Sequence, residues 1–242
     1  MRRLTFIMSL FICSQSFSSE QVFELANKQY VNENYSLAIS LYDSILTSGL
    51  ESSELYFNLG NCHYKTNDWA NAIWHYEKSL QLDNNEKTIH NLELAKLKII
   101  DRIEPLPQLF YKKWWNHLIQ TLSTQVWQIL TLFGIGLIFT LQLISQFTSL
   151  KSKLITKIFS AIAVIILLIT QTSYHNNFNK KEAIILSETI TVKSAASSNS
   201  TNKFTLHSGS KVEIIDIIGD WINIKIANGN SGWIEYQSIK AL

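Results

Sequence analysis

Histidine and cysteine side chains most often supply nucleophiles, bases and metal ligands, and this sequence offers no familiar arrangement of them. The six histidines form neither a His-x-x-x-His nor a Glu-assisted metal spacing; they are His63, His75, His90, His117, His175 and His207. There is no Gly-x-Ser-x-Gly elbow and no phosphate-binding glycine loop. Cys13 lies in an apolar N-terminal segment and Cys62 at a small, packed helical position, so no disulfide framework is expected. We therefore expect no catalytic residues, no metal and no cofactor, and predict that the chain is not an enzyme.

Small, aromatic and aliphatic residues recur with a period of 34 residues. The matched pairs are Ala26 and Gly60, Tyr30 and Tyr64, Tyr35 and Trp69, Ala38 and Ala72, Ile39 and Ile73, Tyr42 and Tyr76, and Leu46 and Leu80. In paired helices the small residues permit close crossing and the aromatic residues fill the gap beside them, so this pattern resembles the tetratricopeptide repeat. It predicts repeats at 19–52 and 53–86, with a capping helix over 87–103 before Pro105 and Pro107. Because about three repeats are usually needed for stability, we expect the membrane or a partner to complete the stack.

The first helix of each pair lines the concave surface of such a stack. The side chains expected on it, as a protein-binding site, are Asn27, Tyr30, Asn58, Asn61, Tyr64 and Lys65. Asparagine amides can hold an extended peptide backbone, and tyrosine adds an apolar wall with a polar tip. Phe23 stands where the carboxylate clamp of some tetratricopeptide domains has lysine, which argues against capture of a terminal carboxylate. The alternative is an unused groove of solvated polar residues.

Two apolar runs, 125–146 and 154–174, are long enough to cross a bilayer, which needs about 20 helical residues. Neither contains an acidic residue, which argues against the alternative, a buried hairpin of a soluble domain. Residues 1–18 have the basic start, apolar run and small polar residues of a signal peptide; an uncleaved anchor is the alternative. Since lysines flank both ends of the hairpin, the export signal decides the orientation. We expect a cytoplasmic connection at 147–153 and both ends outside the cytoplasm.

An amphipathic helix is expected within the linker 105–124. Lys112 and Lys113 lie on its polar face, and Trp114 and Trp115 on its apolar face. Tryptophan and lysine in this arrangement suit the lipid headgroup layer, so we predict that these four residues contact the membrane interface. The alternative is a helix packed on the repeats.

After a linker at 175–182, residues 183–242 consist of short β-branched runs with Gly and Asn at the turns, which predicts a small antiparallel barrel. The runs that begin at Gly219 (Gly-Asp-Trp-Ile-Asn-Ile) and at Gly232 (Gly-Trp-Ile-Glu) resemble the bacterial SH3 family. Such a barrel could bind peptides or wall fragments along a groove formed by Trp221, Trp233 and Tyr236. The alternative is that at least one tryptophan fills the barrel core.

Charge is distributed unevenly along the chain. From Glu20 to Glu104 there are thirteen acidic and seven basic side chains, whereas no acid occurs between Glu104 and Glu182. A net charge of +2 is too small to indicate a nucleic-acid partner.

The junction between the repeats and the apolar runs carries a more specific resemblance. Its residues are 90–96 (His-Asn-Leu-Glu-Leu-Ala-Lys), 101–107 (Asp-Arg-Ile-Glu-Pro-Leu-Pro) and the pair Trp114 and Trp115, and they are similar to BatE proteins of the Bacteroides aerotolerance (Bat) group. The resemblance implies a multidomain α and β protein of the bacterial inner membrane, with its repeat and SH3-like domains in the periplasm. It also implies partnership with von Willebrand-type Bat proteins and a MoxR-like ATPase, and a link to aerotolerance or stress. We therefore expect a scaffold for envelope proteins that also contacts the lipid bilayer; the alternative is an envelope sensor that binds peptidoglycan.

Overall fold

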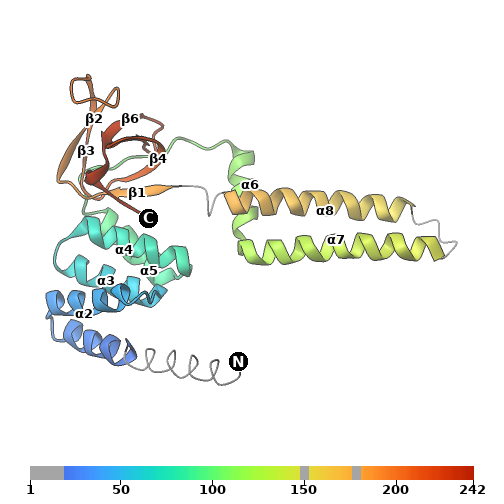
Figure 1. The fold of residues 1–242 in the computed structure, drawn as a ribbon, viewed down its shortest axis with the longest axis horizontal. Coiled ribbons are helices and arrows are strands. Elements are labelled where there is room, and N and C mark those ends of the chain that lie inside the picture. Colours follow the sequence, from blue (N-terminus) through green and yellow to red (C-terminus); the bar gives the residue numbers. More distant parts are fainter. Residues whose placement is uncertain (1–18, 148–152, 176–180) are drawn as a thin grey trace, which may run out of the picture. The chain divides into compact units, whose positions relative to one another are not determined.

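The computed structural model describes residues 19–147, 153–175 and 181–242, which fall into two compact units (Figure 1). One unit, here called the mixed unit, comprises Met1–Pro105 and Glu182–Leu242. The other, here called the hairpin unit, comprises Leu106–Lys181. The predicted signal peptide, residues 1–18, lies outside the described residues, as do 148–152 of the predicted connection.

The repeat domain is built from antiparallel helix pairs. Its helices are residues 19–31, α2 (Tyr35–Thr47), α3 (Ser53–Lys65), α4 (Trp69–Leu82) and α5 (Glu86–Lys96). Ser52 caps α3 by accepting the N–H of Leu55 at 3.0 Å, and Asp68 caps α4 by accepting the N–H of Asn71 at 3.3 Å. The two predicted helix pairs are therefore present.

The crossing of α3 and α4 explains why the repeat alternates small and aromatic residues. Gly60 faces the ring of Tyr76 so closely that an added Cβ would lie 2.5 Å from two ring carbons. The Tyr76 side chain is almost fully buried in this crossing. A helix pair can approach this closely only where one partner has no side chain.

The predicted capping helix ends earlier than expected, at Lys96 rather than at residue 103. The prolines do not end it. Leu97 closes the last turn by donating its N–H to the Glu93 carbonyl, and the chain then turns away. Residues 99–103 contact the C-terminal domain instead, where Ile103 packs against the β core.

The C-terminal domain is a seven-stranded antiparallel sheet in the order β3-β2-β6-β5-β4-β1-β7. Its strands are β1 (Glu182–Ile185), β2 (Thr189–Lys193), β3 (Asn202–His207), β4 (Lys211–Ile218), β5 (Trp221–Lys225), β6 (Ser231–Glu235) and β7 (Ile239–Ala241). Inward residues such as Val192, Ile222, Ile224 and Ile234 are fully buried and form its core. The sequence pattern did not predict β3 and β7, because their residues are mostly polar or too few to show alternation.

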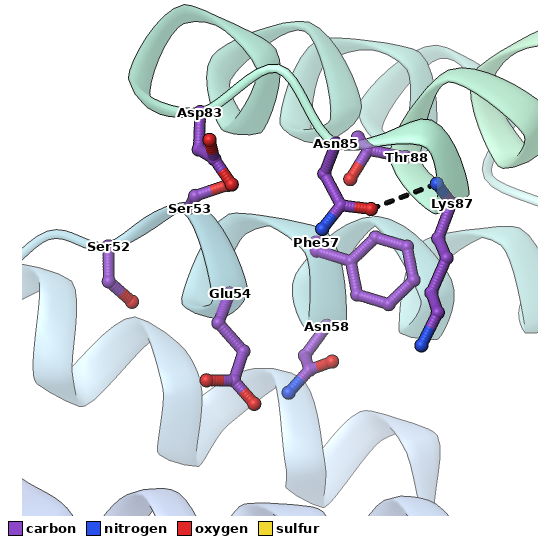
Figure 2. A pocket seen from close by; sticks show the side chains of 9 residues that line it. All are labelled: Ser52, Ser53, Glu54, Phe57, Asn58, Asp83, Asn85, Lys87 and Thr88. Atoms are coloured by element: carbon purple, nitrogen blue, oxygen red, sulfur yellow. Dashed lines mark hydrogen bonds between the residues drawn. The ribbon is translucent and has the colours of Figure 1, made fainter.

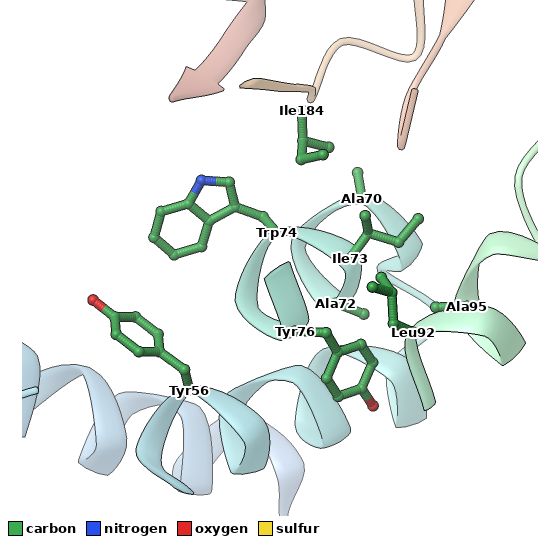
Figure 3. Close-up of a cluster of buried hydrophobic side chains, with 9 residues drawn as sticks. All are labelled: Tyr56, Ala70, Ala72, Ile73, Trp74, Tyr76, Leu92, Ala95 and Ile184. Carbon is green, nitrogen blue, oxygen red and sulfur yellow. The ribbon is translucent and has the colours of Figure 1, made fainter. Parts of the chain in front are cut away.

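The β domain packs on α4, at the end of the stack where another repeat would lie. Ile184 of β1 joins the same buried cluster as Ile73 and Trp74 (Figure 3). The Trp74 indole N–H donates to the Ala241 carbonyl at 2.8 Å. The expectation that the membrane or a partner completes the stack is therefore wrong for this end, because the chain covers it with its own β domain.

Polar groups reinforce the same contact. Lys211 Nζ lies 3.0 Å from a carboxylate oxygen of Glu77 on α4 and 2.7 Å from one of Glu182. Asp101 accepts from the backbone N–H of His207 and from the Ser210 hydroxyl, both at 2.6 Å. Burial by itself would raise the pKa of Asp101, but these hydrogen bonds outweigh it and hold the pKa below its ordinary value.

The hairpin unit contains α6 (Phe110–Gln120), α7 (Thr124–Phe147) and α8 (Lys153–Tyr174). Among the described residues, two helical stretches are long and apolar enough to cross a membrane, Thr124–Ile144 and Lys157–Tyr174. Hydroxyl pairs join them, with Oγ atoms 2.8 Å apart between Thr124 and Ser173 and 2.8 Å between Thr131 and Thr170. Most large apolar side chains of both helices point outward and are exposed, as expected for a surface that lipid covers.

Candidate protein-binding groove

A hollow of about 510 Å³ lies between α3 and the start of α5 (Figure 2). Phe57 forms an apolar wall, and Asn58 and Glu54 reach into the hollow from the same helix. Asn85 is held in place because its side-chain oxygen accepts the N–H of Lys87 at 2.9 Å. The hollow therefore combines one aromatic surface with several amide and charged groups.

A second hollow, of about 190 Å³, follows further along α3 and α5. It is lined by Tyr30, Asn61, Tyr64, Lys65, Tyr76, Asn91 and Leu94. Four of these, Tyr30, Asn61, Tyr64 and Lys65, are binding residues predicted from the sequence. The Tyr64 ring is fixed by an edge contact with Trp69 at 5.1 Å between ring centroids, so this wall is preorganised.

Two equivalent hydrogen-bond networks contribute side chains to these hollows, one repeat apart. In the first, the side-chain oxygen of Asn27 accepts from the Tyr42 hydroxyl at 2.6 Å and from the Asn58 amide at 3.2 Å. In the second, the oxygen of Asn61 accepts from Tyr76 and from Asn91, both at 2.8 Å.

These networks fix the orientation of each amide. The bonds use the oxygen of Asn61 and the nitrogen of Asn91, so the opposite ends of the two amides can hydrogen-bond a peptide carbonyl and a peptide N–H. Burial raises the pKa of both Tyr42 and Tyr76, which therefore stay neutral donors.

Acidic residues surround Phe23, which stands where the carboxylate clamp has lysine. Phe23 lines a hollow of about 460 Å³ whose charged side chains are Glu20, Glu24, Glu51 and Glu54. A terminal carboxylate placed in this hollow would be repelled.

The predicted binding residues divide into three groups. The first group lines the small hollow and consists of Tyr30, Asn61, Tyr64 and Lys65. The second is Asn58, which lines the large hollow. Asn27 lines neither; it supports Asn58 from below. From the sequence, Tyr76 was predicted only as a packing residue, and Asn91 was not predicted at all. Its position was a usable signal, because Asn91 lies 33 residues after Asn58, close to the repeat period.

Cys62 is fully buried in the hydrophobic core of the first helix pairs, as expected for a packing residue. Burial raises the pKa of its thiol to about 12, so the thiolate required for nucleophilic or redox chemistry is not available near neutral pH.

Neither tryptophan of the β domain belongs to its buried core, so the alternative that at least one of them fills the core is wrong; the aromatic residue packed against that core is Phe204. Trp221 and Trp233 are half-buried on the sheet face opposite Ile222 and Ile234, because isoleucine and valine already fill the interior. Tyr236 is exposed in a short 3-10 turn after β6.

The predicted membrane-interface residues lie on α6. Trp114 is exposed, as are Lys112 and Lys113, whereas Trp115 packs on a small cluster that includes Ile119 and Trp127. One face of α6 therefore contacts its own hairpin unit.

Comparison with known protein families finds a match within the repeat domain. The family model of the tetratricopeptide repeat matches residues 53–86, which contain α3 and α4. No curated protein matches the chain. The helix pair that contributes most of the groove is therefore a tetratricopeptide repeat, of the kind that generally mediates binding to protein partners.

Proposed function

We propose that the protein is a non-enzymatic, membrane-anchored scaffold that holds partner proteins through extended segments bound in the groove between α3 and α5. The observation that carries this proposal is the pair of Asn–Tyr–Asn networks, which orient amides at two successive hollows. Amides that recur at a regular spacing can hydrogen-bond the regularly spaced peptide groups of an extended chain.

The composition of the mixed unit supports the proposed topology. It contains segments from both sides of the hairpin, which supports the proposal that the two ends of the hairpin lie on one side of the membrane. Residues 20–105 and 182–242 carry 19 acidic and 12 basic side chains, a net charge of −7, while 106–181 carry seven lysines and no acid. An acidic mixed unit, together with apolar helices flanked by lysines in the hairpin unit, agrees with a folded domain outside the cytoplasm and a hairpin in the inner membrane.

The resemblance to BatE proteins suggests which partners to test first. They are von Willebrand-type Bat proteins and a MoxR-like ATPase system, in a process linked to aerotolerance or stress. The proposed contribution of this chain is assembly rather than redox chemistry, in keeping with the buried state of Cys62.

A second candidate function is a periplasmic sensor of the cell wall. The outward-facing, half-buried Trp221 and Trp233 favour it, because the accessible part of an aromatic ring can stack on sugar or peptide groups. In this reading the SH3-like domain binds peptidoglycan and the repeats transmit the bound state.

Crosslinking and affinity capture of the full-length chain from intact membranes test the scaffold. We expect the double variant Asn58→Ala with Lys65→Glu to lower recovery of specific partners about tenfold, equivalent to about 1.4 kcal/mol. It removes an amide from one hollow and reverses a charge in the other. Lys28→Glu, which changes charge on an exposed residue outside both hollows, is the matched control.

Equal recovery from the double variant and the control would place the binding site elsewhere. Asn61→Ala is less informative, since it also deprives the buried Tyr76 hydroxyl of its acceptor and so costs stability.

A further inference from the structure

The outer face of the β sheet carries an aromatic surface flanked by carboxylates, which the groove does not involve. Directly opposite residues on paired antiparallel strands point to the same face. One row across β4, β5 and β6 is Ile218, Trp221 and Glu235, and the next is Asp216, Asn223 and Trp233. We call these six residues the tryptophan face.

The face points away from the domain core. Ile222 lies between its residues on β5 and Ile234 between those on β6, and both are fully buried on the other side of the sheet. Ile218 is 54% exposed, although it lies directly opposite Trp221. Large aromatic and aliphatic groups therefore remain partly accessible to solvent on an ordered sheet.

The charged side chains around Trp221 indicate which kind of ligand this face would bind. Asp216 and Glu235 are exposed on the face, and Asp220 is exposed in the turn beside Trp221. Two lysines share this face: Lys193 lies directly opposite Trp233 but is bound to the loop that follows it, with Nζ 3.0 Å from the Ser198 carbonyl. Lys225 is exposed in the next row along β5, so the carboxylates gather at the Trp221 end of the face. A tryptophan ring with carboxylates around it attracts a cationic side chain through both its π system and its neighbours' charge.

Asn223 adds an observation that stability does not explain. Its side-chain oxygen is buried and has no hydrogen-bond partner in the described part of the chain. Leaving a buried acceptor unpaired costs free energy, so an apolar residue here would be at least as stable. In register, this amide lies directly opposite Trp233 and two residues along β5 from Trp221, where an extended peptide backbone could supply the missing N–H once the rings move apart.

We infer that the tryptophan face binds a basic, extended peptide segment of a partner protein, with an arginine or lysine side chain on Trp221 between Asp216 and Glu235. The inference rests on the proposed function only in taking the partner to be a protein. It concerns a second surface, so a scaffold could lose this binding and keep that of the groove.

The test uses the full-length protein in nanodiscs of zwitterionic lipid and two fluorescent peptides that alternate valine with either arginine or glutamate. We expect the arginine peptide to bind at least about tenfold more tightly than the glutamate peptide, and less tightly at high salt. Trp221→Ala and Asp216→Asn should each weaken that binding about fivefold or more. Glu188→Gln, which neutralises an exposed acid before β2, is the control and should change it less than about twofold.

Asn223→Val separates a binding role from a structural one. We expect it to weaken peptide binding while the thermal unfolding midpoint stays the same or rises. Equal binding of both peptides would overturn the inference, as would loss of binding only in the Asn58→Ala with Lys65→Glu variant. Retention of purified wall fragments, with no binding of the arginine peptide, would overturn it in favour of a sugar ligand.

Discussion

Gly60→Val should destabilise the repeat domain by about 3 kcal/mol, near the upper end of the cost of overpacking a core. The added Cβ alone would lie 2.5 Å from two carbons of the Tyr76 ring. The ring cannot easily move, because it is buried and its hydroxyl donates to Asn61 at 2.8 Å. The variant therefore disturbs both the helix crossing and the amide network of the groove.

Urea-dependent pulse proteolysis of the full-length chain in nanodiscs would measure this change. Gly49→Asn is the matched control: Gly49 has φ +83°, which asparagine tolerates better than most residues, and its Cβ would meet no atom within 4 Å. We expect the control to cost less than about 1 kcal/mol. A Gly60→Val protein as stable as the control would mean that α3 and α4 do not cross at this distance.

Trp74→Ala should destabilise the repeat domain and the β domain together, by about 3–5 kcal/mol for loss of a buried tryptophan. Trp74 belongs to α4, yet its indole donates to Ala241 at 2.8 Å and the Lys240 ammonium lies 3.7 Å from its ring centroid. The same side chain therefore stabilises both domains.

Hydrogen exchange followed peptide by peptide would distinguish coupled from independent domains. We expect faster exchange in α4 and also in β1 and β7. Trp221→Ala, which removes a half-buried tryptophan from the outer sheet face, should leave α4 unchanged. Faster exchange in α4 with full protection of β1 and β7 would show that the β domain is stable without this contact.

The parts of the fold with strong periodicity were predictable from the sequence. The 34-residue period of Gly60 and Tyr76 with their counterparts located both helix pairs, because small and aromatic residues must alternate where helices cross closely. The apolar helices were predicted nearly to their ends, since length and lack of charge are direct requirements of a bilayer.

Contacts between domains were not predictable, because they depend on residues distant in sequence. Asp101 resembled part of a long helix, yet its carboxylate bonds His207 and Ser210 more than 100 residues later. Similarly, Tyr42 donates to the Asn27 amide and Tyr76 to the Asn61 amide because their helices cross, which the local sequence pattern does not reveal. That Trp221 and Trp233 lie on the same face of the sheet follows from the register of β5 and β6, which the alternation of apolar and polar residues within each strand does not determine.

The most direct test of the proposed architecture is the accessibility of single cysteines, introduced before, after and within the hairpin in a background that carries both Cys13→Ala and Cys62→Ala. Lys28→Cys lies in the repeat domain and Ser198→Cys in an exposed loop of the β domain. Ser149→Cys lies in the predicted connection. We predict that a membrane-impermeant maleimide labels the first two from the periplasmic side, and Ser149→Cys only after lysis. Labelling of Lys28→Cys and Ser198→Cys from opposite sides would contradict the account.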